Sequence, residues 1–145
     1  MSRPEITLEE DPEVADEIST ALQRWNESQV GPRRTQRLTL TIRGADGELL
    51  GGLVGEFFWT FLYVADLWIA DRYRGRGFGQ ALLGRAEELA AARGCSVAFL
   101  STMTFQAPGF YEKCGYAAFG SLPYAPAPLG RTWFAKALGE GVSVQ

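Results

Sequence analysis

The middle of the chain alternates polar and apolar positions in the manner of half-buried β-strands. Residues 37–43 alternate strictly, with β-branched side chains among them, and residues 45–48 supply an Asp-Gly turn typical of a hairpin. A return strand is expected over residues 49–58. A further strand is expected over residues 61–69, after a short turn. The pattern therefore predicts three consecutive antiparallel strands.

Two segments follow helical periodicity instead. Asp11-Pro12 provides an N-cap and a proline at the first helical position, and apolar residues then recur three or four positions apart until Gly31. A second helix has apolar positions between Ala81 and Ala90 and is expected to end at Arg93-Gly94. Both helices are predicted to be amphipathic or buried along one face.

The last third of the chain reads as short elements in alternation. An apolar run predicts a buried strand at residues 97–103, and Pro108 begins a short helix through Cys114. Strands are expected at residues 116–119 and 132–137, separated by a proline-rich loop. Because the chain shows no internal repeat or linker, we expect a single domain over residues 1–145.

The composition removes several kinds of chemistry. The 145 residues contain no histidine, which excludes histidine triads, histidine-ligated metals and a histidine general base. Cys95 and Cys114 lack a CxxC spacing and read as reduced thiols, so no metal site is expected. A net charge of -3 argues against a general polyanion binder and predicts no nucleic-acid partner.

The chain also lacks a membrane signature. Residues 1–17 carry seven acids and one basic residue, unlike a secretory signal. The most apolar stretch, residues 53–70, is interrupted by Glu56 and Asp66, which are costly in a bilayer, so buried strands are favoured over a membrane span. We therefore expect a cytoplasmic protein without a membrane partner.

A glycine-rich loop between a strand and a helix has the character of a phosphate site. Glycines in residues 74–79 allow close backbone approach, the helix amides favour an anion, and Arg72, Arg74 and Arg76 add charged donors. A P-loop is excluded because Gln80-Ala81 replaces its lysine and hydroxyl residue. A dinucleotide-binding loop is excluded because residue 80 is not glycine and the next strand does not end in an acid.

The loop spacing Arg-x-x-Gly-x-Gly resembles the central motif of the GCN5-related N-acetyltransferases. Residues 110–116, Phe-Tyr-Glu-Lys-Cys-Gly-Tyr, resemble the second signature of that family, and Ala107 matches as well. The family often has an asparagine seven residues before the tyrosine, where this chain has Thr104. Either Thr104 or the nearby amide of Gln106 is a candidate replacement in contacting pantetheine.

The resemblance implies an α/β (α+β) fold with a mixed, mostly antiparallel twisted sheet, helices on both faces and a V-shaped opening between the fourth and fifth strands. It implies acetyl-CoA as acetyl donor. Tyr111 would be the general acid for the departing thiolate. The cofactor-binding residues implied are Leu67, Trp68 and Ile69 through their main chain, Arg74, Gly75, Arg76, Gly77, Phe78 and Gly79 in the loop, and Thr104 and Tyr111.

The general base and the acceptor are less defined. Because the chain has no histidine, the candidates for the general base are Asp66, Glu56, Glu27 and an ordered water. An aromatic acceptor wall is expected from Trp25, Asn26, Trp59, Trp68 and residues 122–126. The function expected is direct acetyl transfer to a primary amine of a small molecule. The alternatives are a peptide or protein acetyltransferase and a non-enzymatic acyl-CoA-binding module, and a homodimer is left open.

Overall fold

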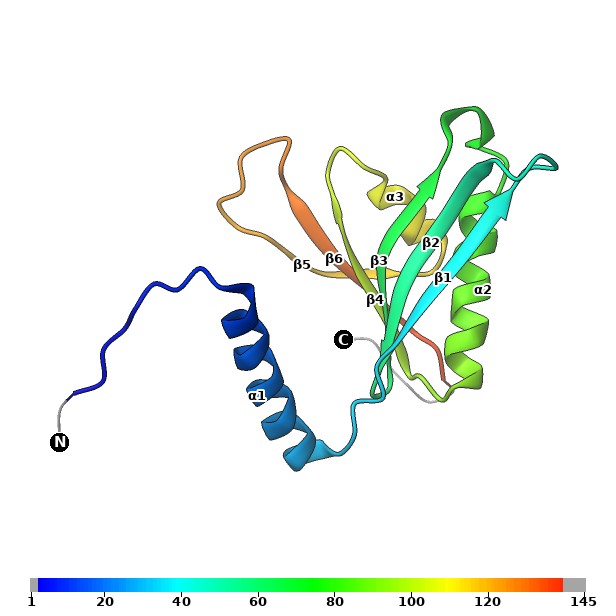
Figure 1. The fold of residues 1–145 in the computed structure, drawn as a ribbon. Helices are drawn as coiled ribbons and strands as arrows, with labels where there is room; N and C mark the ends of the chain where they lie inside the picture. Colours follow the sequence, from blue (N-terminus) through cyan, green and yellow to red (C-terminus); the bar gives the residue numbers. More distant parts are fainter. Residues whose placement is uncertain (1–2, 140–145) are drawn as a thin grey trace. The chain divides into compact units, whose positions relative to one another are not determined.

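The computed structural model describes residues 3–139, which fall into two compact units, one up to residue 33 and one from residue 34 onward (Figure 1). Each unit is described by itself. The first contains α1 (Pro12–Val30). The second contains β1 (Gln36–Arg43), β2 (Leu49–Phe58), β3 (Phe61–Ile69), the 3-10 turn η1 (Asp71–Tyr73), α2 (Phe78–Ala92), β4 (Val97–Met103), α3 (Pro108–Lys113), β5 (Ala117–Ser121) and β6 (Arg131–Ala137).

Helix α1 begins and ends where its sequence predicts. The side chain of Asp11 accepts a hydrogen bond from the amide of Glu13 at 2.9 Å, and Pro12 occupies the first turn. The helix ends at Gly31, whose φ of +93° favours glycine. None of its residues is buried, so its apolar stripe, which includes Ile18 and Trp25, is exposed within this unit.

The second unit is built on a six-stranded sheet in the order β1-β2-β3-β4-β6-β5. Every neighbouring pair is antiparallel except β3 and β4, which are parallel. The predicted three-strand meander and the mixed, mostly antiparallel sheet are therefore confirmed. Several boundaries differ by one or two residues from those expected. The strand expected from Tyr116, for example, begins at Ala117, because the Tyr116 amide still bonds to the Tyr111 carbonyl in the last turn of α3.

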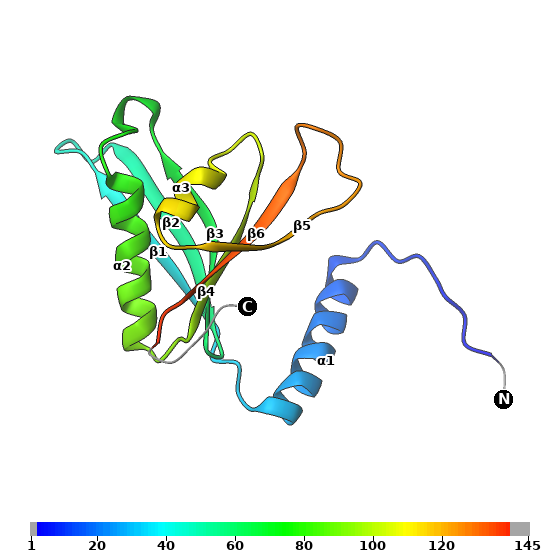
Figure 2. The ribbon, with the colours of Figure 1, turned by 180° about the vertical axis from the view of Figure 1, so that it is seen from behind.

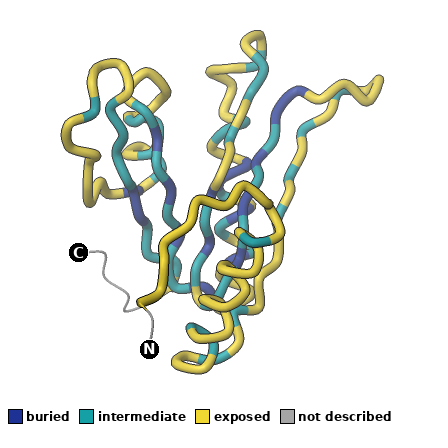
Figure 3. Tube along the Cα trace, turned by 60° about the vertical axis from the view of Figure 1, so that its left-hand side comes forward, coloured by how far each residue is buried: buried dark blue, intermediate teal, exposed yellow. Residues whose placement is uncertain are grey.

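One face of this sheet forms the core. Alternate residues of β2 and β3 are buried, including Leu53, Phe57 and Leu62, and they pack with Leu83 and Ala86 of α2. Figure 2 shows α2 and α3 on the same side of the sheet, and Figure 3 shows the buried positions along the strands and α2. The resemblance implied helices on both faces; within residues 34–139 both helices lie on one.

The sheet divides at its parallel pair. Strands β3 and β4 pair only between residues 61–63 and residues 97–99, whereas β3 stays paired with β2 to Ile69 and β4 with β6 to Met103. The two strands therefore diverge toward their carboxyl ends (Figure 1). This is the expected V-shaped opening, but it lies between the third and fourth strands of this chain, because residues 3–35 contain no strand ahead of β1.

Candidate active site

A cavity of about 900 Å³ occupies the opening between the diverging strands. Its walls come from the second half of β3, the glycine-rich loop, the first turn of α2, the end of β4 and the start of α3. Beyond Tyr63, the edge of β3 that faces β4 has no strand partner. The cavity is therefore lined by backbone groups that a bound ligand can reach.

The glycine-rich loop positions the N-terminus of α2 at this cavity. Gly75 and Gly77 have φ values of +76° and +86°, which side chains rarely adopt, and α2 begins directly after them. No side chain caps α2, and the amides of Phe78, Gly79 and Gln80 precede the first intrahelical bond, from Ala81. The three residues line the cavity, so the positive end of the helix dipole is directed at it.

Gly79 has a different role from the two loop glycines. A Cβ at this position would lie 3.2 Å from Cζ of Phe110 in α3 and 4.0 Å from Ile69 in β3. The absence of a side chain therefore lets the first turn of α2 pack directly against α3. This close approach places residues of both signature motifs in the lining of one cavity.

The arginines of the loop are held by local contacts. Arg74 donates from Nε to the Ile69 carbonyl at 2.9 Å and pairs with Asp71 at 3.1 Å, and it lines the cavity. Arg72 is ion-paired with Glu48 at 2.6 Å. The guanidinium of Arg76 lies 5.3 Å from the centre of the Tyr73 ring. Of the three predicted phosphate donors, only Arg74 is among the cavity residues.

Tyr111 lines the same cavity from α3. Its ring packs 6.0 Å from Phe134 and 6.1 Å from Tyr116, measured between ring centres, and its carbonyl accepts the Tyr116 amide at 3.0 Å. Burial raises the pKa of Tyr111, with a smaller contribution from Cys114. The phenol is therefore protonated at neutral pH and available as a hydrogen-bond donor.

The two candidates for the family asparagine are placed differently. Thr104 does not line the cavity; its hydroxyl donates to the Pro128 carbonyl at 2.9 Å, and its amide donates to the Gly130 carbonyl. Gln106 lines the cavity, and its Oε1 accepts from the Met103 amide at 2.7 Å. This bond orients the Gln106 amide and leaves its NH2 group as the donor for a ligand.

The three carboxylates named as candidate bases differ in whether they line the cavity. Asp66 lines the cavity on β3, next to Trp68 and the half-buried Leu67. Glu56 lies on β2 opposite Tyr63 and is not among the cavity residues. Glu27 lies on α1, in the first unit.

The expected acceptor wall is only partly at the cavity. Trp68 lines it, whereas Trp59 sits in the β2–β3 turn, at the far end of β3, and residues 122–126 do not line it. Trp25 and Asn26 lie on α1 in the first unit. Sequence reasoning missed Ser101 and Thr102, which line the cavity from β4. The sequence did contain a signal for them, because Ser101 and Thr102 are two adjacent hydroxyl residues at the end of an otherwise apolar strand.

No helix within residues 3–139 has the length and apolarity needed to cross a bilayer. Within the same residues, acidic and cysteine side chains do not gather into a cluster of three that could bind a metal ion.

Residues 5–116 match the model of the acetyltransferase (GNAT) family. The blasticidin-S acetyltransferase of Streptomyces morookaense is 41% identical over 115 residues, covering 78% of this chain and 85% of that protein. A crystal structure of an acetyltransferase from Bacillus cereus superposes with a TM-score of 0.85 at 25% identity, covering 92% of this chain and 97% of that one.

A more distant acetyltransferase from Bacillus anthracis, solved in complex with acetyl coenzyme A, shares the fold with a TM-score of 0.61 at 22% identity, covering 78% of this chain and 67% of that one. The fold and the family match agree with the two motifs. The chain belongs to the GNAT family of acetyltransferases, enzymes that use acetyl-CoA as the acetyl donor.

Proposed function

We propose that this acetyltransferase moves an acetyl group directly from acetyl-CoA to a primary amine of a small molecule. One observation carries the proposal. The diverging strands β3 and β4 open onto a cavity whose lining includes both the uncapped N-terminus of α2 and Tyr111. An anion site and a proton donor on one cavity are what an acyl-CoA thioester requires.

The cofactor would be bound mainly through the backbone. The amides of Phe78, Gly79 and Gln80 would donate to the pyrophosphate, with Arg74 beside them. Pantetheine would pair with the unpartnered edge of β3 between Leu67 and Ile69, in place of the missing strand. Gln106 supports the pantetheine better than Thr104 does, because only Gln106 faces the cavity.

The reaction then needs three proton transfers, two from the acceptor nitrogen and one to the departing sulfur. An ammonium acceptor loses a proton to Asp66, directly or through water, and its lone pair attacks the thioester carbonyl carbon. A β3 amide stabilises the negative carbonyl oxygen. The C–N bond forms and the nitrogen, now positively charged, gives its second proton to water. The C–S bond breaks with its electron pair on sulfur, and Tyr111 protonates the thiolate. Solvent restores the phenol, so the products are the acetamide, CoA thiol and a proton.

A small acceptor is supported by the shape of the site and by a relative. The cavity lies between strand ends and α3, with Trp68 and Asp66 at its wall. The relative that is 41% identical is named for blasticidin S, which is a small molecule. A peptide substrate is the competing hypothesis, and it predicts turnover of peptide N-termini above that of small amines.

Thiol release separates these hypotheses. The protein is incubated with acetyl-CoA and, separately, with blasticidin S, a panel of small primary amines, and peptides with free N-termini. We expect release of CoA thiol with small amines, and saturable acetyl-CoA binding by calorimetry. Binding without thiol release from any amine would indicate an acyl-CoA-binding module. An absence of heat and of thermal stabilisation at saturating acetyl-CoA would refute the proposed site altogether.

A further inference from the structure

Two opposite charges lie beside the cavity on the face of the sheet that points away from α2. Asp66 on β3 is paired with Val54 on β2. The neighbours of Val54, Leu53 and Gly55, are buried toward the core, so Val54 and its partner Asp66 lie on the other face of the sheet. Asp66 is exposed and lines the cavity. Among residues 3–139, no cationic side chain lies within 4.0 Å of it.

The positive charge is Arg131, the first residue of β6. Its Nε donates to Oγ of Ser101 at 2.8 Å, and Ser101 lines the cavity from β4. The guanidinium carbon lies 5.8 Å from the ring centre of Trp133, the residue directly opposite Ser101. Ser101 and Trp133 together hold the guanidinium beside a residue of the cavity lining.

Arg131 has no carboxylate partner within the described residues. It is half-buried, yet no acidic oxygen of residues 3–139 lies within 4.0 Å, unlike Lys136 farther along the same strand. The bond to Ser101 uses one of five N–H donors. A partly desolvated guanidinium without an anion is costly, and its planar fork matches a carboxylate.

The chain also positions the residue that precedes Arg131. The Gly130 carbonyl accepts the Thr104 amide at 2.8 Å, and the Thr104 hydroxyl bonds to Pro128. A Cβ at Gly130 would lie 2.9 Å from Cγ2 of Thr104, so the contact requires glycine. The end of β4 therefore anchors the start of β6 beside the cavity, which gives Thr104 a structural function.

From this arrangement we infer that the acceptor is a zwitterion, a primary amine that also carries a carboxylate. Its carboxylate binds Arg131 and Ser101, and its ammonium group faces Asp66 across the opening. The inference rests on the proposed acetyl transfer and adds the class of acceptor. Asp66 then has one consistent function, because the carboxylate that attracts the ammonium also receives its proton.

Matched pairs of acceptors test this inference. The probes are ω-amino carboxylates of two to six carbons and the α-amino acids, each compared with its own primary amide, and thiol release gives kcat/KM. We expect each accepted carboxylate to exceed its amide. Arg131→Met should lower kcat/KM about 100-fold for the carboxylate and less than about threefold for the amide, as for the loss of a charge-assisted bidentate contact.

Three variants keep the outcome interpretable. Arg85→Met removes an exposed arginine of α2 that pairs with Glu88 and should change neither substrate. Arg131→Lys keeps the charge and should restore part of the preference. Ser101→Ala removes one hydrogen bond and should reduce the preference less than Arg131→Met does. Thermal melting and the KM for acetyl-CoA verify that each variant is folded and binds its cofactor.

Several results would overturn the inference. Equal losses for carboxylates and amides in Arg131→Met, or turnover of amines without turnover of any amino carboxylate, both contradict a carboxylate subsite. These results leave acetyl transfer itself intact. Failure of every amine with the wild-type protein, with acetyl-CoA still bound, is instead a failure of the proposed function.

Discussion

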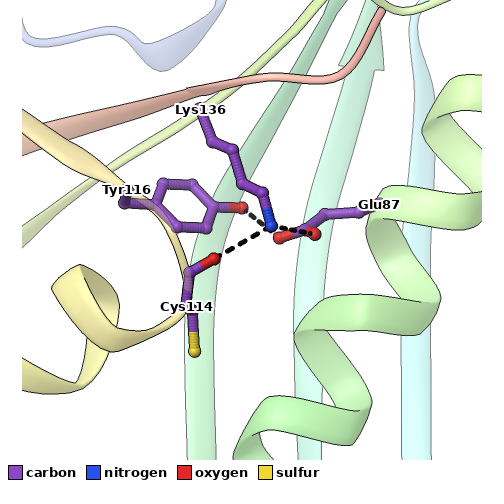
Figure 4. A network of polar contacts seen from close by, with 4 residues as sticks. All are labelled: Glu87, Cys114, Tyr116 and Lys136. Carbon is purple, nitrogen blue, oxygen red and sulfur yellow. Dashed lines mark hydrogen bonds and ion pairs between the residues drawn. The ribbon is translucent and has the colours of Figure 1, made fainter.

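Nζ of Lys136 on β6 lies 2.8 Å from Oε1 of Glu87 on α2, and the pair is largely shielded from solvent (Figure 4). Lys136 also donates to the Cys114 carbonyl at 2.9 Å, and the Tyr116 hydroxyl donates to the second oxygen of Glu87 at 2.8 Å. Burial and the Glu87 carboxylate raise the pKa of Tyr116, so the phenol remains a donor. The network joins α2, β6 and the end of α3 behind Tyr111.

Lys136→Met should destabilise the fold. The substitution leaves Glu87, whose side chain is 14% exposed, without its cationic partner, and the Cys114 carbonyl loses a donor. We expect the free energy of unfolding to fall by about 3 kcal/mol. Urea unfolding followed by circular dichroism measures it. Arg85→Met, which breaks an exposed pair on the same helix, should cost less than about 1 kcal/mol; equal costs would show that burial of the network contributes nothing.

Tyr111→Phe should reduce turnover without weakening cofactor binding. The phenylalanine keeps the packing against Phe134 and Tyr116 and removes only the hydroxyl. We expect kcat to fall about 100-fold with an unchanged KM for acetyl-CoA, the usual range for a general acid.

The pH dependence of the wild-type enzyme checks the same role. Because the pKa of Tyr111 is raised in the folded protein, the phenol stays protonated through pH 9 and beyond. No loss of activity from its ionisation should therefore occur below the ordinary tyrosine value of about 10. A descending limb between pH 7 and 9 that disappears in Tyr111→Phe would show that Tyr111 ionises in this range and would contradict its raised pKa.

Gly77→Ala should weaken acetyl-CoA binding. Its φ of +86° is strained for alanine by roughly 1–2 kcal/mol, although the space around it is open. Displacement of the loop would misplace the amides of α2, so we expect the dissociation constant measured by calorimetry to rise about tenfold. The matched control is Gly84→Ala, in the interior of α2 and also in open space, which should leave affinity unchanged and stabilise the helix slightly.

Asp66→Asn and Glu56→Gln should differ in their effects. Asp66 lines the cavity and Glu56 does not, although both interrupt apolar strands. We expect Asp66→Asn to lower kcat about 100-fold, as expected for loss of a general base, and Glu56→Gln to change it less than about threefold. Turnover against pH over the acidic range measures both, and the reverse ranking would assign the base to Glu56.

The sequence by itself determined most of the local structure. The signals that set the elements are local and extend over only a few residues. They are the alternation over residues 37–43, the Asp11-Pro12 helix start, and the glycines after residues 30 and 93. Their effects are set by backbone conformation and by which face is buried, so the element boundaries agree with the structure to within a few residues. The two motifs also identified the family.

The tertiary structure decided which polar residues meet. Asp66 and Glu56 look alike in sequence, but a β-bulge between Val54 and Gly55 and the divergence of β3 from β4 place only Asp66 at the cavity. Gln106 rather than Thr104 lines the cavity, because Thr104 bonds to the loop before β6. Arg131 reaches Ser101 because β6 pairs with β4, a contact between residues 30 positions apart that local patterning does not encode.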